Sequence, residues 1–124
     1  MANIKMGVIG YGNMGTTHCR NIAGGKVAGM ELAAICDHAK EREEAAKINH
    51  PDVAFFENAT LLMKSGICDA VLIATPHYDH PKMAIEAFDC GLDVIIEKPA
   101  GVYTKQVLEM NDAAEKKGKL FGIM

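Results

Sequence analysis

The chain lacks the features that mark membrane-spanning and nucleic-acid-binding proteins. No apolar run approaches the roughly 20 residues needed to cross a bilayer, and the longest runs, 70–74 and 94–96, have the length of strands. Basic residues are not in excess, because 13 lysines and arginines stand against 16 aspartates and glutamates, for a net charge of −3. We therefore expect neither a membrane nor a nucleic acid as the main partner.

Paired cysteine motifs are also missing. The four cysteines are widely spaced, and none belongs to a Cys-x-x-Cys pair (Cys19, Cys36, Cys68 and Cys90). This spacing disfavours zinc sites and thioredoxin-like redox sites and favours reduced thiols that act as small apolar residues. Because no secretory signal is evident at the N-terminus, we expect a cytoplasmic protein.

Repeats, low-complexity tracts and linkers are absent as well. A length of 124 residues, with 49% hydrophobic and 23% charged residues, fits one globular domain over residues 1–124. A domain of this size buries roughly two-thirds of the surface that its unfolded chain exposes. The sequence can therefore form a true hydrophobic core.

Apolar runs of strand length alternate with helical patterns along the chain. Short connections separate them, so the strands should be parallel with right-handed crossovers. We predict an α/β fold, a doubly wound parallel (Rossmann) sheet in the order 3-2-1-4-5-6 with helices on both faces. The predicted strands are Lys5–Ile9, Leu32–Cys36, Val53–Phe56, Ala70–Ala74, Val94–Glu97 and Leu120–Ile123, and the predicted helices are Asn13–Ala23, Glu41–Ile48, Ala59–Lys64, His80–Asp89 and Thr104–Lys117.

The last helix and strand carry apolar residues whose packing the pattern also predicts. Val107, Leu108 and Ala114 lie on one side of the helix. The final strand and its end are expected to expose apolar surface if a neighbouring domain is absent (Leu120, Phe121, Ile123 and Met124). We then expect concentration-dependent dimers.

A Gly-x-Gly-x-x-Gly turn follows the first predicted strand and opens the first helix. The motif alone is weak, but its place between strand and helix is typical of a dinucleotide-binding turn. The first glycine permits the tight turn, the second lets a pyrophosphate approach the backbone, and the third lets helix and strand pack closely. The helix amino end then faces the phosphates. The candidate contacts are Gly10, Gly12, Asn13, Met14 and Gly15.

Asp37 ends the second predicted strand, where an acidic residue contacts the adenosine ribose in such folds. Its carboxylate would accept hydrogen bonds from the ribose hydroxyls and repel a 2′-phosphate, so we expect NAD as cofactor, with NADP disfavoured. No arginine follows at once to offset that repulsion, since Arg42 comes only after His38, Ala39 and Lys40. The alternative is that Asp37 only caps the next helix, and the two roles can coexist.

The loop after the fourth predicted strand supplies three more candidates, Thr75, Pro76 and His77. Ligands of doubly wound sheets lie at the carboxyl ends of strands near the point where the strand order reverses, so this loop should border the cofactor. The segment 77–80 places two histidines and an aspartate close together. We do not expect a metal there, because adjacent positions rarely converge on one ion and no distant ligand cluster accompanies them.

Glu97, Lys98 and Pro99 follow the fifth predicted strand at the same sheet edge. An ammonium there can orient a hydroxyl or carbonyl beside a nicotinamide, and can move a proton if burial lowers its pKa. A lone lysine at a loop start is more often merely solvated. Its position beside the other candidates makes Lys98 the candidate catalytic residue and a cofactor contact, with Glu97 as its partner or a ribose contact.

These motifs together resemble the N-terminal domain of the Gfo/Idh/MocA (glucose–fructose oxidoreductase/inositol dehydrogenase) family. The matching residues extend over nearly the whole chain in the family's order: 10–15, Asp37, 74–77 with His80, and 97–99. The resemblance implies NAD(P) binding and dehydrogenase activity on a hydroxyl of a sugar, cyclitol or related polyol. It also implies that Lys98 is the catalytic lysine and that 75–77 and Glu97 lie near the cofactor.

The family also has a C-terminal α/β domain that supplies substrate contacts, catalytic partners and usually the oligomer interface. No segment of this chain matches it, so we expect little turnover by these residues alone, and we expect the full-length protein to be a homo-oligomer. The alternative is a stand-alone nicotinamide-nucleotide-binding module without chemistry. Methyltransferases that use S-adenosylmethionine and proline-forming reductases share parts of the glycine-rich pattern, but neither accounts for Glu97-Lys98-Pro99.

Overall fold

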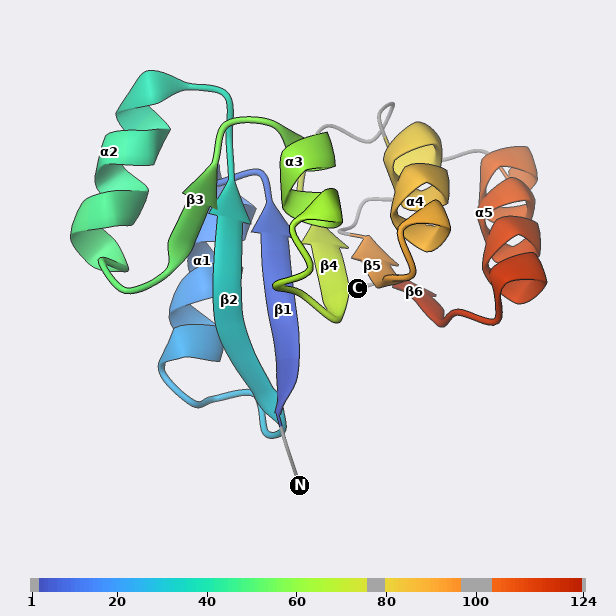
Figure 1. The fold of residues 1–124 in the computed structure, drawn as a ribbon, viewed down its shortest axis with the longest axis horizontal. Coiled ribbons are helices and arrows are strands. Elements are labelled where there is room, and N and C mark those ends of the chain that lie inside the picture. Colours follow the sequence, from blue (N-terminus) through green and yellow to red (C-terminus); the bar gives the residue numbers. More distant parts are fainter. Residues whose placement is uncertain (1–2, 76–79, 97–103, 124) are drawn as a thin grey trace.

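The computed structural model describes residues 3–75, 80–96 and 104–123, and within them the chain forms one parallel sheet (Figure 1). The six strands lie in the order β3-β2-β1-β4-β5-β6. The order reverses between β1 and β4, which confirms the predicted doubly wound sheet. The strands are β1 (Ile4–Ile9), β2 (Met30–Cys36), β3 (Ala54–Phe56), β4 (Ala70–Ile73), β5 (Asp93–Ile96) and β6 (Phe121–Ile123).

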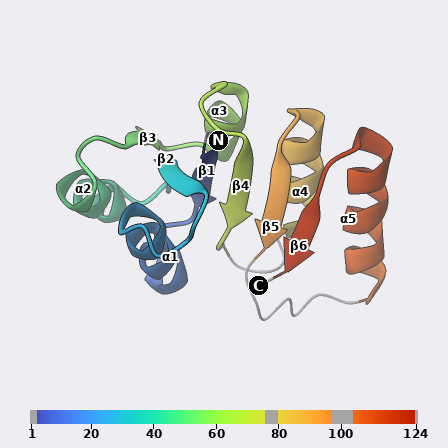
Figure 2. The same cartoon turned by 90° about the horizontal axis from the view of Figure 1, so that it is seen from below.

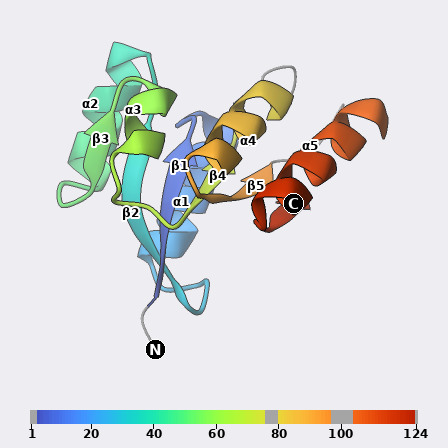
Figure 3. The same ribbon diagram turned by 45° about the vertical axis from the view of Figure 1, so that its right-hand side comes forward.

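Helices cover both faces of the sheet (Figure 2). One face packs against α1 and α2, and the other against α3, α4 and α5. On the second face α4 and α5 lie side by side, as Figure 3 shows. The helices are α1 (Asn13–Ala23), α2 (Lys40–Asn49), α3 (Ala59–Lys64), α4 (His80–Asp89) and α5 (Thr104–Lys117).

Two hydrophobic cores result, because the central strands are buried on both faces. Alternate side chains of β4 point to opposite faces, so Val71 and Ile73 enter the core under α3, α4 and α5, while Leu72 enters the core under α1 and α2. Phe88 of α4 is 1% exposed and meets Phe121 of β6 edge-to-face, at 6.2 Å between ring centroids. This contact fixes α4 over the last strand.

The apolar side of α5 differs from the prediction. Ala114 is buried, but Leu108 is 61% exposed, and Met110 is the residue that the core encloses completely. The reason is geometric, since positions 110 and 108 are separated by about 200° around a helix. Helix α5 turns the side that carries Met110 and Ala114 toward the core, and Leu108 points away. No helix among the described residues is long and apolar enough to cross a membrane.

Candidate cofactor site

The carboxyl ends of the central strands meet at one edge of the sheet, where the predicted site residues that the structure describes come together. The N–H of Gly10 donates to Cys36 O at 2.7 Å, which joins the end of β1 to the end of β2. The N–H of Ala74 donates to Ile9 O at 2.8 Å, which joins the end of β4 to β1. Asp37 and the glycine-rich turn therefore share the point where the strand order reverses.

Gly10 and Gly15 are required by the fold of the turn. Gly10 has φ +101°, a conformation that L side chains rarely adopt. A Cβ on Gly15 would lie 1.7 Å from the carbonyl oxygen of Gly10, so no side chain fits between helix α1 and strand β1. Both residues serve the tasks that the motif predicts, a tight turn and close packing.

Gly12 differs, because the fold does not require a glycine there. Its φ of −84° suits any residue. A Cβ placed on it would have ordinary contacts of 3.7 to 3.8 Å with the guanidinium atoms of Arg42, the nearest atoms among the described residues. A glycine at this position therefore fits a ligand that approaches the backbone closely, as the pyrophosphate of a dinucleotide does.

The amino end of α1 fits an anionic group. The first helical hydrogen bond runs from Thr16 N–H to Gly12 O at 2.8 Å, so the amides of residues 13–15 point out of the helix end. Among the described residues, no side chain caps this end and the first turn has no acidic residue. Met14 is 47% exposed beside it. The orphan amides and the helix dipole together favour phosphate.

Asp37 is 5% exposed, and its carboxylate accepts three hydrogen bonds. The donors are the N–H groups of Tyr11 at 2.8 Å and Ala39 at 2.9 Å, and the Arg42 guanidinium at 3.2 Å. Burial is the largest influence and raises the pKa of Asp37, but the three donors together outweigh it and lower that pKa below its ordinary value. The side chain is therefore an ionised acceptor fixed beside the glycine-rich turn. The bond from Ala39 lies in the turn before α2, whose first residue is Lys40, and no side chain caps the amino end of that helix among the described residues, so the alternative of a capping role for Asp37 is not borne out.

The sequence analysis missed Arg42 as a part of this site. Its Nη1 lies 3.2 Å from Asp37 Oδ2, and its guanidinium lies next to Gly12. Although four residues separate Arg42 from Asp37 in the sequence, the first turn of α2 brings position 42 back over the end of β2. The spacing Asp-x-x-x-x-Arg across a strand-to-helix turn was the available signal.

Tyr11 is a second residue that the sequence did not single out. It is 4% exposed, its hydroxyl accepts a hydrogen bond from Asn49 Nδ2 at 3.0 Å, and its ring meets His50 edge-on. Its carbonyl accepts from Thr16 Oγ1 at 3.3 Å, and its N–H is bound to Asp37. Tyr11 therefore ties the glycine-rich turn to the end of α2. Burial lowers the pKa of the His50 imidazole below its ordinary value.

The second half of the predicted site is described only at Thr75. A Cβ on Gly10 would lie 3.1 Å from both Cγ2 and N of Thr75, which places this threonine against the turn. Its hydroxyl lies 3.7 Å from the sulfur of Met83. The remaining candidates lie outside the described residues (Pro76, His77, Glu97 and Lys98). No cluster of potential metal ligands is present in the described part of the chain.

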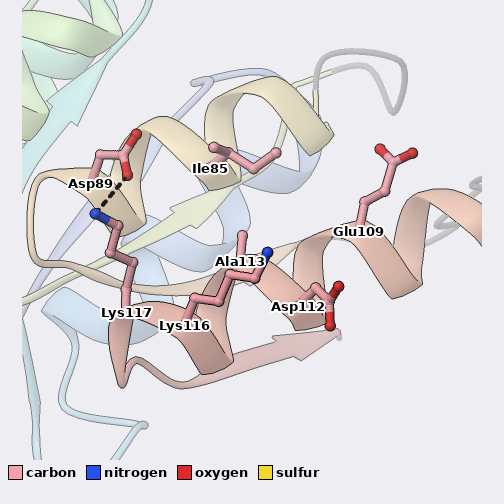
Figure 4. Close-up of a pocket in the computed structure, with 7 residues that line it drawn as sticks. All are labelled: Ile85, Asp89, Glu109, Asp112, Ala113, Lys116 and Lys117. Carbon is pink, nitrogen blue, oxygen red and sulfur yellow. Dashed lines mark ion pairs between the residues drawn. The ribbon is translucent and has the colours of Figure 1, made fainter.

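A separate shallow groove of about 470 Å³ lies between α4 and α5 (Figure 4). Its wall includes Asp89 and Lys117, whose carboxylate and ammonium are 3.4 Å apart, at the carboxyl ends of the two helices. Because these helices run antiparallel to the strands, their carboxyl ends lie toward the opposite edge of the sheet from Gly12. The groove is not part of the candidate cofactor site.

Comparisons with known proteins agree with the fold. The family model for Gfo/Idh/MocA, described as an oxidoreductase family with an NAD-binding Rossmann fold, matches residues 4–124. Inositol 2-dehydrogenase 1 of Saccharopolyspora erythraea is 31% identical over 117 residues, which cover 94% of this chain and 34% of that protein.

Two solved structures extend the comparison. Scyllo-inositol dehydrogenase from Lactobacillus casei, solved with bound NAD(H) and scyllo-inositol, has a TM-score of 0.86 and 26% identity over 98% of this chain and 36% of its own. The WlbA dehydrogenase from Bordetella pertussis, solved with NADH and UDP-GlcNAcA, has a TM-score of 0.86 and 29% identity over 96% of this chain and 35% of its own. The chain thus spans about a third of the length of these relatives. It belongs to the Gfo/Idh/MocA oxidoreductase family and has that family's NAD-binding Rossmann fold.

Proposed function

We propose that this chain is the cofactor-binding part of an NAD-dependent dehydrogenase that acts on a hydroxyl of a sugar, cyclitol or related polyol. The observation that carries the proposal is Gly12, a glycine that the fold does not need, facing the exposed amino end of α1 beside the ionised Asp37. Relatives of similar fold include inositol dehydrogenases and a sugar-nucleotide dehydrogenase, which supports the substrate class.

In this proposal, different residues of the chain bind different parts of the cofactor. The backbone of Gly10, Gly12, Asn13, Met14 and Gly15 holds the pyrophosphate. Asp37 accepts hydrogen bonds from the adenosine ribose, for which its low pKa keeps it charged. Thr75, Pro76, His77 and Glu97 border the nicotinamide half. When bound, the nicotinamide supplies the hydride acceptor or donor.

Lys98 has the proton-handling role, which we assign from the family resemblance. Its amine takes the proton of the substrate hydroxyl during oxidation and returns it during reduction. The test measures turnover of a panel of polyols by the full product of the gene in the presence of NAD. Lys98→Met should lower kcat by about 100-fold, the size typical of a general base, and change NADH affinity far less.

The matched control is Lys64→Met, which removes an exposed lysine from the last turn of α3. It should leave kcat unchanged. Turnover that Lys98→Met does not affect would contradict the role of this lysine. Binding of NADH without turnover of any polyol would favour the alternative, a nicotinamide-nucleotide-binding module without chemistry.

We further propose a cytoplasmic homo-oligomer for the whole protein, with a small-molecule substrate. All four cysteines are unpaired, which supports a reducing compartment. Leu120, just before β6, is 75% exposed and offers apolar surface for association. Light scattering on the full gene product should give a mass above that of one chain, and a monomer at high concentration would contradict the oligomer.

A further inference from the structure

The ion pair of Asp37 and Arg42 lies where the adenosine end of a dinucleotide is expected. The Asp37 side chain is 2% exposed and fixed by two backbone donors, whereas that of Arg42 is 49% exposed. The carboxylate is thus held in place, and the guanidinium has room to move toward a ligand. The same guanidinium lies beside Gly12, on the side from which a pyrophosphate would approach.

We propose that Arg42 is a second determinant of nucleotide selectivity, which offsets Asp37 and allows the site to accept the 2′-phosphate of NADP. The inference rests on the proposed cofactor-binding function. Asp37 disfavours a 2′-phosphate by like charge, and Arg42, 3.2 Å away, supplies a planar donor group that suits phosphate. The pair therefore gives a modest preference for NAD instead of exclusion of NADP.

Other charged groups near Asp37 are poorly placed for this role. His38 Nδ1 is 3.9 Å from Asp37 Oδ1, but its side chain is 94% exposed and turned to solvent. Lys40 is also exposed at the start of α2. Lys47, farther along the same helix, pairs with Glu43 at 2.6 Å. Arg42 is the cation that contacts both Asp37 and the space next to Gly12.

The test is titration of the folded chain with NADH and NADPH, read as the ratio of their Kd values. Arg42→Gln should raise the ratio Kd(NADPH)/Kd(NADH) about tenfold, because NADPH would lose one charge-assisted hydrogen bond that NADH does not make. A tenfold change in Kd corresponds to about 1.4 kcal/mol of binding free energy. Asp37→Ser should shift the preference toward NADPH. The double variant Asp37→Ser/Arg42→Gln should bind NADPH about tenfold more weakly than Asp37→Ser alone.

The matched control is Lys47→Gln, which removes one positive charge from the same helix without touching Asp37 and should leave the ratio unchanged. An Arg42→Gln variant that weakens both nucleotides equally would overturn the inference and leave cofactor binding intact. Binding of neither nucleotide by the folded wild-type chain would overturn the proposed function, and the inference with it. Denaturant midpoints of all variants establish that each is folded.

Discussion

Replacing Gly12 by alanine tests whether this glycine is required for folding or for cofactor binding. The backbone of Gly12 has φ −84°, which alanine adopts without strain, and the added Cβ would have contacts no closer than 3.7 Å. The folded state should therefore accept Gly12→Ala. Because alanine also restricts the unfolded chain, the free energy of unfolding should stay level or rise by about 0.4–1 kcal/mol.

Cofactor binding should respond in the opposite direction. The new methyl group would occupy the surface that the pyrophosphate approaches, so one or two hydrogen bonds between amides and phosphate would be lost. Each such charge-assisted bond contributes about 1.5–3 kcal/mol. At 1.4 kcal/mol for each factor of ten, NADH affinity should fall at least tenfold and up to about a thousandfold or more.

The assay combines denaturant unfolding with calorimetric titration of NADH. Gly122→Ala is the matched control, since Gly122 lies on strand β6, away from the turn, and a Cβ there would lie 4.0 Å from Ile95 of strand β5. It should leave NADH affinity unchanged. A Gly12→Ala chain that binds NADH as tightly as wild type would refute the reasoning about the close approach. A variant that no longer folds would refute the geometry of the turn.

Three further predictions concern the turn, the buried carboxylate and the thiols. Gly15→Ala, whose Cβ would lie 1.7 Å from Gly10 O, should lower the free energy of unfolding by more than about 2 kcal/mol, and an unchanged denaturant midpoint would contradict this. The pKa of Asp37 lies below its ordinary 3.8, so the stability from this carboxylate is present above about pH 4 and is lost as the pH falls through the lowered value. The stability deficit of Asp37→Asn, measured by denaturation, should therefore be constant from pH 7 to about pH 5 and shrink below pH 4; a deficit that grows in acid would be inconsistent. Burial raises the pKa of three thiols to about 11 or 12 (Cys19, Cys36 and Cys68), so alkylation at pH 8 followed by mass spectrometry should label Cys90 first, and rapid labelling of the others would count against the buried cores.

The fold was predictable because local signals and long-range packing agree. Helix α3 matches its predicted bounds, and Asn58 caps it by accepting hydrogen bonds from Thr60 and Leu61. Strand β2 begins at Met30, two residues before the predicted start, because Met30 pairs with Ile4 of β1. Such pairing depends on a neighbouring strand, and no local pattern in the sequence reveals it.

The side-chain arrangement of the site was less predictable. The glycines, Asp37 and Thr75 do meet at one edge, as the alternation of strands and helices predicts. The contact of Arg42 with Asp37 depends on how the first turn of α2 sits over β2, which residue types alone do not determine. The roles of Pro76, His77, Glu97 and Lys98 remain predictions, because these residues lie outside the described part of the chain.

Isothermal titration of the folded 124-residue chain with NADH tests the central claim most directly. If the glycine-rich turn and Asp37 hold a dinucleotide, the titration should show one NADH bound per chain, and Gly12→Ala should weaken that binding while keeping the fold. The absence of any binding heat at several temperatures, from a chain that unfolds cooperatively, would contradict the account.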